Sequence, residues 1–136
     1  MFMTPAELRA IRDHLGLSHE WLAEALGVTD RTIRRWESGA APIPPGVAQR
    51  MGELAAQTRR FVQSVVREVR RDPPDPDGAR WVQTYRNDED YRRFAPNGGW
   101  SAGWHRAAMQ RVKNAEPSVR LHYAGDTSGA SGIDKE

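Results

Sequence analysis

Cysteine is absent from the 136 residues of this chain. Its absence excludes disulfides, thiolate metal sites and a cysteine nucleophile. Histidines are few and lie far apart, without the spacing of metal ligands: His14, His19, His105 and His122. We therefore expect neither a metal nor a cofactor.

Long apolar runs are also lacking. No stretch approaches the ~20 apolar residues that a membrane-spanning helix needs, and the first residues lack the basic and apolar regions of a signal peptide. Paired catalytic carboxylates, a nucleophile motif and a phosphate-cradling loop are missing too. We expect a cytoplasmic protein that is not an enzyme and does not contact a membrane.

The chain has little excess charge of either sign, since its formal net charge is only +2. The positive charge is concentrated in residues 46–71, where six arginines and two glutamates give a net charge of +4. Arginine greatly outnumbers lysine, which suits bidentate contacts with phosphate or guanine, although a GC-rich genome produces the same bias. Any nucleic-acid binding must therefore be argued from local surfaces.

Three short helices are predicted in the first 39 residues. Thr4, Ser18 and Thr29 each precede a helical apolar pattern and are good N-caps. A glycine follows each pattern and predicts its end: Gly16, Gly27 and Gly39. Two short helices joined around a glycine are typical of a helix-turn-helix.

The third of these helices carries an unusual polar face in the stretch GVTDRTIRRWESG, residues 27–39. Val28, Ile33 and Trp36 supply the inward apolar positions, and we expect Trp36 to be a core residue rather than a stacking platform. In a helix-turn-helix the second helix enters the major groove with its N-terminal residues toward the base edges. The opposite, polar face is therefore a candidate base-reading surface.

Individual roles follow from side-chain chemistry. Arginine can donate two hydrogen bonds to guanine O6 and N7, so the main candidate readers are Arg31, Arg34 and Arg35. Asp30 can accept from cytosine N4, or it can orient Arg34 through an i,i+4 pair. Candidate phosphate contacts are Thr29 and Thr32 on the same helix and Ser18 and His19 at the start of the preceding helix.

An alternative remains open for this face, because arginine-rich exposed helices are often solvated surface without a partner. Glu37, near the end of the same helix, is expected to pair with a nearby arginine or to cap a neighbouring helix. The same two interpretations apply to the basic clusters at residues 59–60 and 67–71. These arginines either contact flanking phosphates or RNA, or form a solvated helix face.

A longer helix follows the proline-rich loop at residues 40–45. From Gly46 to Arg71, apolar residues recur at three- and four-residue steps, with Thr58 filling a gap in the series. Gly52 lowers helix stability by about 1 kcal/mol relative to alanine, so two helices with a bend are an alternative.

The stretch DPPDPDG, residues 72–78, predicts a linker. Beyond it we expect a strand at 79–86, a short helix at 87–94, a turn at 97–99, a helix at 101–114 and a strand at 118–125. The expected organisation is a DNA-binding domain with its long following helix at 1–71, a C-terminal module at 79–124 and a disordered tail at 125–136. The fold class is thus mostly α, with a small α+β C-terminal part.

Aromatic residues gather in the C-terminal module, which holds seven of the eleven in the chain. A unit of under 50 residues buries too little surface to be stable alone, so we expect it to pair with a second copy. The residues predicted to mediate dimerisation are Trp81, Tyr85, Trp100 and Trp104. A small-molecule pocket, or a core that docks on the N-terminal domain, are the alternatives.

The stretch LRAIRDHLGLSHEWLAEALGVTDRTIRRWESG resembles the phage-repressor-type helix-turn-helix family (Cro/cI, also called Xre). Further motifs, MTPAELRAIR, RWESGAAPIPPGV, TYRNDEDYRRF and GWSAGWHRAA, resemble the anti-CRISPR-associated repressors and their uncharacterised bacterial relatives. That resemblance implies a homodimer that binds an inverted repeat in its own promoter and pairs through its C-terminal domain. Arg31 matches an arginine of that family's recognition helix, whereas Asp30, Arg34 and Arg35 depart from its pattern.

The function predicted from the sequence is a dimeric transcriptional repressor that binds double-stranded DNA and excludes polymerase from a promoter. The main alternative is an antitoxin whose C-terminal half binds a toxin. RNA is a further candidate partner.

Overall fold

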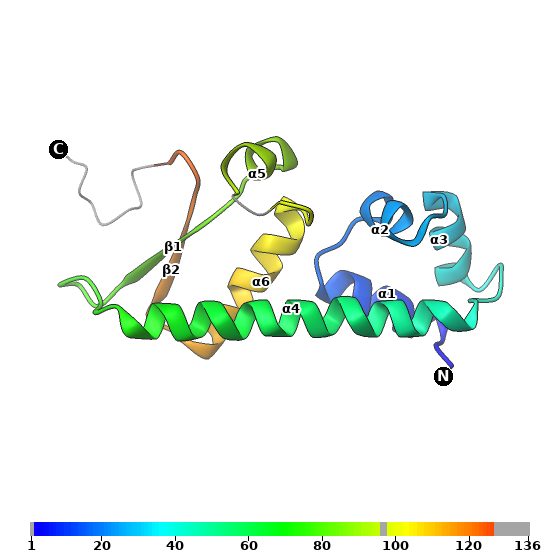
Figure 1. Ribbon diagram of the computed structural model, residues 1–136, viewed down its shortest axis with the longest axis horizontal. Helices are drawn as coiled ribbons and strands as arrows, with labels where there is room; N and C mark the ends of the chain where they lie inside the picture. Colours follow the sequence, from blue (N-terminus) through cyan, green and yellow to red (C-terminus); the bar gives the residue numbers. More distant parts are fainter. Residues whose placement is uncertain (1, 96–97, 127–136) are drawn as a thin grey trace. The chain divides into compact units, whose positions relative to one another are not determined.

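The computed structural model describes residues 2–95 and 98–126. It divides into two compact units, Met1–Arg59 (unit 1) and Arg60–Glu136 (unit 2), which are described separately. Figure 1 shows the six helices and the two strands of the described residues. The predicted fold class is confirmed, because the chain is mostly helical with one small sheet in its C-terminal part.

Unit 1 begins with three short helices, α1 (Pro5–His14), α2 (His19–Leu26) and α3 (Asp30–Ser38). The predicted caps are all present, since the side chains of Thr4, Ser18 and Thr29 each accept a backbone N–H of the following turn. Both α2 and α3 end at a glycine with left-handed backbone, Gly27 at φ 73° and Gly39 at φ 84°. Side chains at these two positions would be strained, which explains why glycine stops each helix.

Helix α4 (Pro45–Arg71) is one continuous helix, so the predicted alternative of two helices with a bend is wrong. Gly52 is exposed and does not interrupt it. Because Met51 and Leu54 on either side are buried, their packing outweighs the weak helix propensity of one glycine. In unit 1 this part of α4 completes a core with α1, α2 and α3, formed by Leu8, Leu15, Leu22, Ile33, Trp36, Val47, Met51 and Leu54.

Thr58 fills the gap in the apolar series of α4 as predicted. It is 1% exposed, and its hydroxyl donates to the Leu54 carbonyl at 2.8 Å. Beyond it, Val62 and Val66 are the buried positions, whereas the predicted inward residues Phe61, Val65 and Val69 are only partly buried. The apolar stripe of α4 is therefore wider in unit 2 than the sequence series indicated.

Unit 2 contains β1 (Arg80–Thr84), α5 (Asp88–Phe94), α6 (Ala102–Ala115) and β2 (Val119–Tyr123), in addition to the second half of α4. The two strands pair in parallel, with Val82 opposite Leu121, and α5 and α6 form the crossover between them. The core consists of Val62, Val66, Ala108, Met109, Val112 and Val119, with Val82 and Leu121 packed against it. One face of the small sheet is therefore covered by α4 and α6.

Residues 72–78, the predicted linker, lie inside unit 2 between α4 and β1. The Asp75 amide donates to the Ala79 carbonyl at 2.7 Å and closes this loop just before β1. Of the predicted tail, residues 125 and 126 follow β2 in a turn, and 127–136 lie outside the described residues. The predicted turn at 97–99 also begins outside them. No helix in the described part of the chain is long and apolar enough to cross a membrane.

Candidate nucleic-acid interface

Helix α3 has one buried and one exposed face. Ile33 and Trp36 are 0% and 6% exposed, which confirms Trp36 as a core residue. The three candidate readers, Arg31, Arg34 and Arg35, are all exposed. Since residues three and four apart share a helix face, they form one cationic surface on the side of α3 that the core does not use.

Arg34 lies between two carboxylates. Its Nη2 is 3.5 Å from Glu20 of α2 and 3.8 Å from Asp30, the residue predicted to orient it. All three side chains are about half exposed or more, so these ion pairs contribute little to stability. They restrict the guanidinium without consuming its hydrogen-bonding capacity.

Arg31 and Arg35 are less restrained. Arg31 makes no hydrogen bond or ion pair with any residue that the structure describes, and Arg35 donates to the Ala40 carbonyl at a long 3.4 Å. Both guanidinium groups therefore keep donors available for an external acceptor.

The polar residues at the helix N-termini have local roles. Ser18 Oγ accepts from the Trp21 amide at 2.9 Å, and Thr29 Oγ1 accepts from the Thr32 amide at 3.2 Å. The hydroxyls of Thr29 and Thr32 are 3.0 Å apart. These caps hold the starts of α2 and α3 in place, while Ser18 and Thr29 remain exposed.

A buried ion pair joins α1 to the end of α3. Arg12 is 7% exposed, and its Nε and Nη2 donate to the two oxygens of Glu37 at 2.6 and 3.0 Å. Nη1 donates to the Leu17 carbonyl at 3.0 Å, and His19 Nε2 lies 3.1 Å from Glu37 Oε1. The prediction that Glu37 pairs with an arginine is confirmed, and the pair orients His19 at the start of α2.

Electrostatics favour the charged form of both partners. The hydrogen bond with Glu37 raises the pKa of Arg12. Burial alone would raise the pKa of Glu37, but the hydrogen bonds from Arg12 and His19 outweigh it and lower the pKa. The pair therefore stabilises the fold above the ordinary glutamate pKa of about 4.3, and this contribution is lost as the pH falls through the lowered value.

A hollow of about 330 Å³ opens beside this network. Its lining combines three arginines and a histidine with a single carboxylate: Arg9, Arg12, His19, Arg34, Glu37 and Ser38. An excess of cationic groups at the start of α2 suits an anion such as a backbone phosphate.

Two residues of this surface were not predicted from the sequence. Arg12 lies four residues after Leu8, on the inward face of α1, and a charged residue at a core position was the available signal for its buried partner. Glu20 meets Arg34 only through the packing of α2 against α3, so no sequence spacing indicated it.

The four residues predicted to mediate dimerisation occupy different environments in unit 2. Tyr85 and Trp104 are 5% and 2% exposed and belong to the unit's own core. Trp100 stacks on Trp104 with ring centroids 4.3 Å apart. Trp81 is half-buried on β1, with the Arg120 guanidinium 5.1 Å from its ring centroid.

His105 sits in the aromatic cluster of unit 2. Its ring centroid is 4.8 Å from Tyr85 and 5.9 Å from Phe61, and Nδ1 lies 2.8 Å from Thr84 Oγ1. Burial lowers its pKa to about 4. His105 is therefore a neutral structural residue near pH 7.

The comparison with protein families agrees with the geometry of unit 1. Residues 6–60 match the family model described as a helix-turn-helix domain. No curated protein matches the sequence significantly. This part of the chain is a helix-turn-helix domain, a class that binds DNA and is typical of non-enzymatic regulators. The narrower resemblance to phage and anti-CRISPR-associated repressors stays a prediction.

Proposed function

We propose that the protein is a homodimeric transcriptional repressor that binds an inverted repeat in double-stranded DNA, in the cytoplasm. The observation that carries the proposal is the exposed cationic face of α3 in a matched helix-turn-helix domain. Such a face is positioned to enter the major groove while its opposite side stays in the core.

Sequence reading is assigned to the three arginines of α3. Arg31, whose guanidinium is without a described partner, is the primary reader and grips a guanine through O6 and N7. Arg35 lies one turn further along the same face. Arg34 is a third reader, aligned by Asp30 and Glu20 at 3.8 and 3.5 Å.

Backbone contacts are assigned to the helix N-termini. The hydroxyls of Ser18, Thr29 and Thr32 and the ring of His19 contact phosphates. The capping bonds and the Arg12–Glu37 pair support this assignment, because they fix these groups before DNA arrives. Phosphate contacts set the position of the protein on the duplex, and the arginines supply the specificity.

Repression would follow from occlusion. A dimer places two recognition helices on one face of DNA about 34 Å apart, so that it covers a promoter and excludes polymerase. An autoregulatory target is expected from the resemblance to anti-CRISPR-associated repressors.

Selection of bound duplexes from a random DNA library, at two salt concentrations, tests the proposal. We expect enrichment of an inverted repeat with guanines in each half-site. Arg31→Ala should bind the selected site about 5- to 150-fold more weakly, since a bidentate arginine–guanine contact contributes about 1–3 kcal/mol. Arg92→Ala, on the exposed surface of α5 in unit 2, is the matched control and should stay within about twofold.

Two results would contradict the proposal. Binding that is salt-sensitive but selects no sequence would reduce α3 to an electrostatic anchor. If the purified protein selected no DNA by itself and bound DNA only in a tight complex with a second protein, the antitoxin interpretation would be favoured.

A further inference from the structure

The sheet of unit 2 has only two strands, so each strand has an outer edge. Arg80 N donates to Ser118 O at 2.9 Å, and Ala124 N donates to Thr84 O at 2.8 Å. Since the backbone groups of a strand alternate in direction along a ladder, Val82 also faces β2, together with Arg80 and Thr84. The intervening residues of each strand direct their N–H and C=O groups outward.

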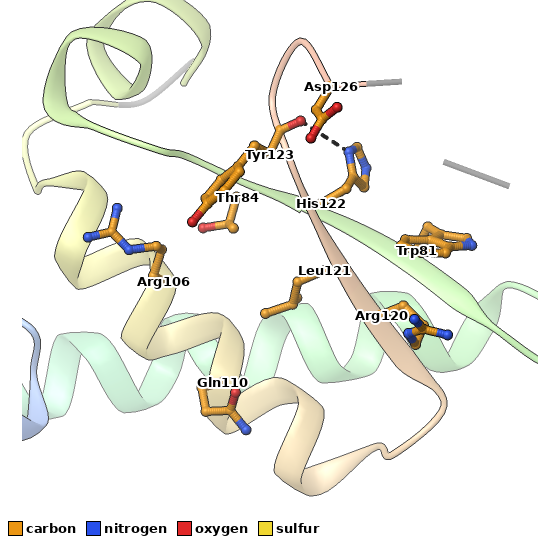
Figure 2. A pocket seen from close by; sticks show the side chains of 9 residues that line it. All are labelled: Trp81, Thr84, Arg106, Gln110, Arg120, Leu121, His122, Tyr123 and Asp126. Carbon is orange, nitrogen blue, oxygen red and sulfur yellow. Dashed lines mark hydrogen bonds between the residues drawn. The ribbon is translucent and has the colours of Figure 1, made fainter. Parts of the chain in front are cut away.

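The outer edge of β2 is capped at both ends by its own unit, and three of its six outward groups (Leu121 N, Leu121 O and Tyr123 N) are without a described partner. Val119 N donates to Glu116 O at 3.0 Å, and Val119 O accepts from Lys113 Nζ at 2.7 Å. At the other end, Tyr123 O accepts from Asp126 N at 2.9 Å. Figure 2 shows the side chains from both strands and α6 that line a hollow of about 550 Å³, with Asp126 at the Tyr123 end of β2. Local capping of this kind protects a sheet edge from pairing.

The outer edge of β1 is capped only at its ends. Ala79 O accepts from Asp75 N, and Tyr85 O accepts from Arg106 Nη1, both at 2.7 Å. Between these caps lie the N–H and C=O groups of Trp81 and Gln83, four groups that no described residue pairs. Gln83 is also exposed.

We propose that this edge of β1 pairs antiparallel with the β1 edge of a second copy, giving a four-stranded sheet in the order β2-β1-β1-β2. Trp81 exchanges both backbone hydrogen bonds with the partner's Gln83, and Gln83 does the same with the partner's Trp81. The two-fold axis passes between the two copies of Val82. The inference rests on the proposed function, for which it names the dimer interface.

The open groups of the β1 edge match their own copy about a two-fold axis. With a two-fold axis at Val82, the four open groups of each chain pair with the four of its copy. Four hydrogen bonds form between the chains, and none of these groups is left open. Val82 becomes a non-hydrogen-bonded pair with its own copy, in which side chains lie closest. Since Val82 is only partly buried against the core of unit 2, the partner's valine would extend that core.

Side-chain chemistry is compatible with this register. Arg80 lies opposite the partner's Thr84, so no like charges oppose each other across the interface. A two-stranded sheet is marginal by itself. Doubling the sheet therefore corrects the main structural weakness of unit 2.

Proline at position 83 gives the first test, in the full chain. Proline is tolerated on an edge strand whose N–H points outward, but it removes one donor and blocks strand addition. We expect Gln83→Pro to sediment as a monomer at a concentration where the wild type is a dimer. Gln83→Ala keeps the backbone N–H and loses only the side chain, whose Nε2 donates to the Tyr85 hydroxyl at 3.4 Å. This variant should remain a dimer.

A cysteine at the axis gives a second test that needs no loss of stability. The natural chain has no cysteine, so Val82→Cys introduces a single thiol that faces its copy across the axis. Mild oxidation should convert most of the protein to a covalent dimer. Arg120→Cys, at an exposed position of β2, is the control. The two copies of β2 would be separated by both β1 strands, so this variant should not cross-link.

The outcomes separate this inference from the proposed function. A Gln83→Pro dimer, or equal cross-linking of the two cysteine variants, would overturn the β1 edge as the interface while leaving a dimeric regulator standing. A monomeric wild type would overturn both the interface and the dimer, without affecting sequence selection by unit 1. A wild type that binds another extended chain along β1 in place of its own copy would also overturn the inference.

Discussion

The two units differ in how completely their own residues pair their charged and backbone polar groups. Unit 1 pairs its buried charges internally: Arg12 bonds Glu37 and the Leu17 carbonyl, and Glu37 also contacts His19. Three of its exposed arginines, Arg31, Arg34 and Arg35, share one face of α3. Unit 2 builds a core from aromatic and apolar residues but leaves four backbone groups of β1 open. This difference underlies the two proposals, that unit 1 binds DNA and that unit 2 pairs with a second copy.

The largest effect is expected at the charged centre of unit 1. Glu37→Ala leaves Arg12 buried without its partner, and such a loss costs about 3–5 kcal/mol. The free energy of unfolding from urea titration should fall by that amount, and unit 2 should keep its far-UV signal at higher urea than unit 1.

An exposed pair gives the matched control. Arg50 and Glu53 are 3.1 Å apart, but both side chains are almost half exposed. Glu53→Ala should therefore cost less than about 1 kcal/mol. If the two variants were equally stable, the buried Arg12–Glu37 pair would contribute no more to the stability of unit 1 than an exposed pair does.

A smaller, pH-dependent effect is expected at His105 in unit 2. Its pKa in the fold is about 4, while the unfolded chain takes up a proton below about 6.5. The unfolded state thus binds more protons between these values, so unit 2 should lose at most about 2 kcal/mol on going from pH 7 to pH 5, since the ring remains partly exposed.

Urea titrations at both pH values check this expectation. His105→Asn keeps an acceptor for Thr84 but cannot titrate, so its stability should change less between the two pH values. His14→Asn, at an exposed position, should retain the wild-type pH dependence. A variant at position 105 that is as pH-sensitive as the wild type would refute the assignment.

The smallest effect separates folding from recognition within unit 1. Thr4 caps α1 in a reciprocal pair with Glu7, each bond being 3.0 Å. Thr4→Ala should lower the free energy of unfolding by about 1 kcal/mol. Its affinity for the selected DNA should be unchanged at 20 °C, because α1 carries no reader; a tenfold weaker complex would show that α1 takes part in recognition.

Local signals in the sequence were enough for the helices of unit 1. Each helix end is set by a residue that acts within one turn, so the local sequence is enough to predict it. These residues are the N-caps Thr4, Ser18 and Thr29 and the glycines Gly27 and Gly39. The inward position of Trp36 and the polar face with Arg31 follow from helical periodicity alone.

Features set by tertiary packing were not predictable in the same way. The strands of unit 2 were predicted, but nothing local indicates that they pair in parallel with Val82 opposite Leu121. The open edge at Trp81 and Gln83 follows only from that register. Likewise, the contact between Glu20 and Arg34 depends on how α2 packs on α3.

The central claim is that unit 1 reads DNA while unit 2 pairs two chains, and binding to a full inverted repeat and to a single half-site tests it most directly. The account predicts two chains on the full site, with the half-site bound at least about 100-fold more weakly because one set of phosphate and base contacts is lost. One chain per site with equal affinity for both duplexes would contradict it.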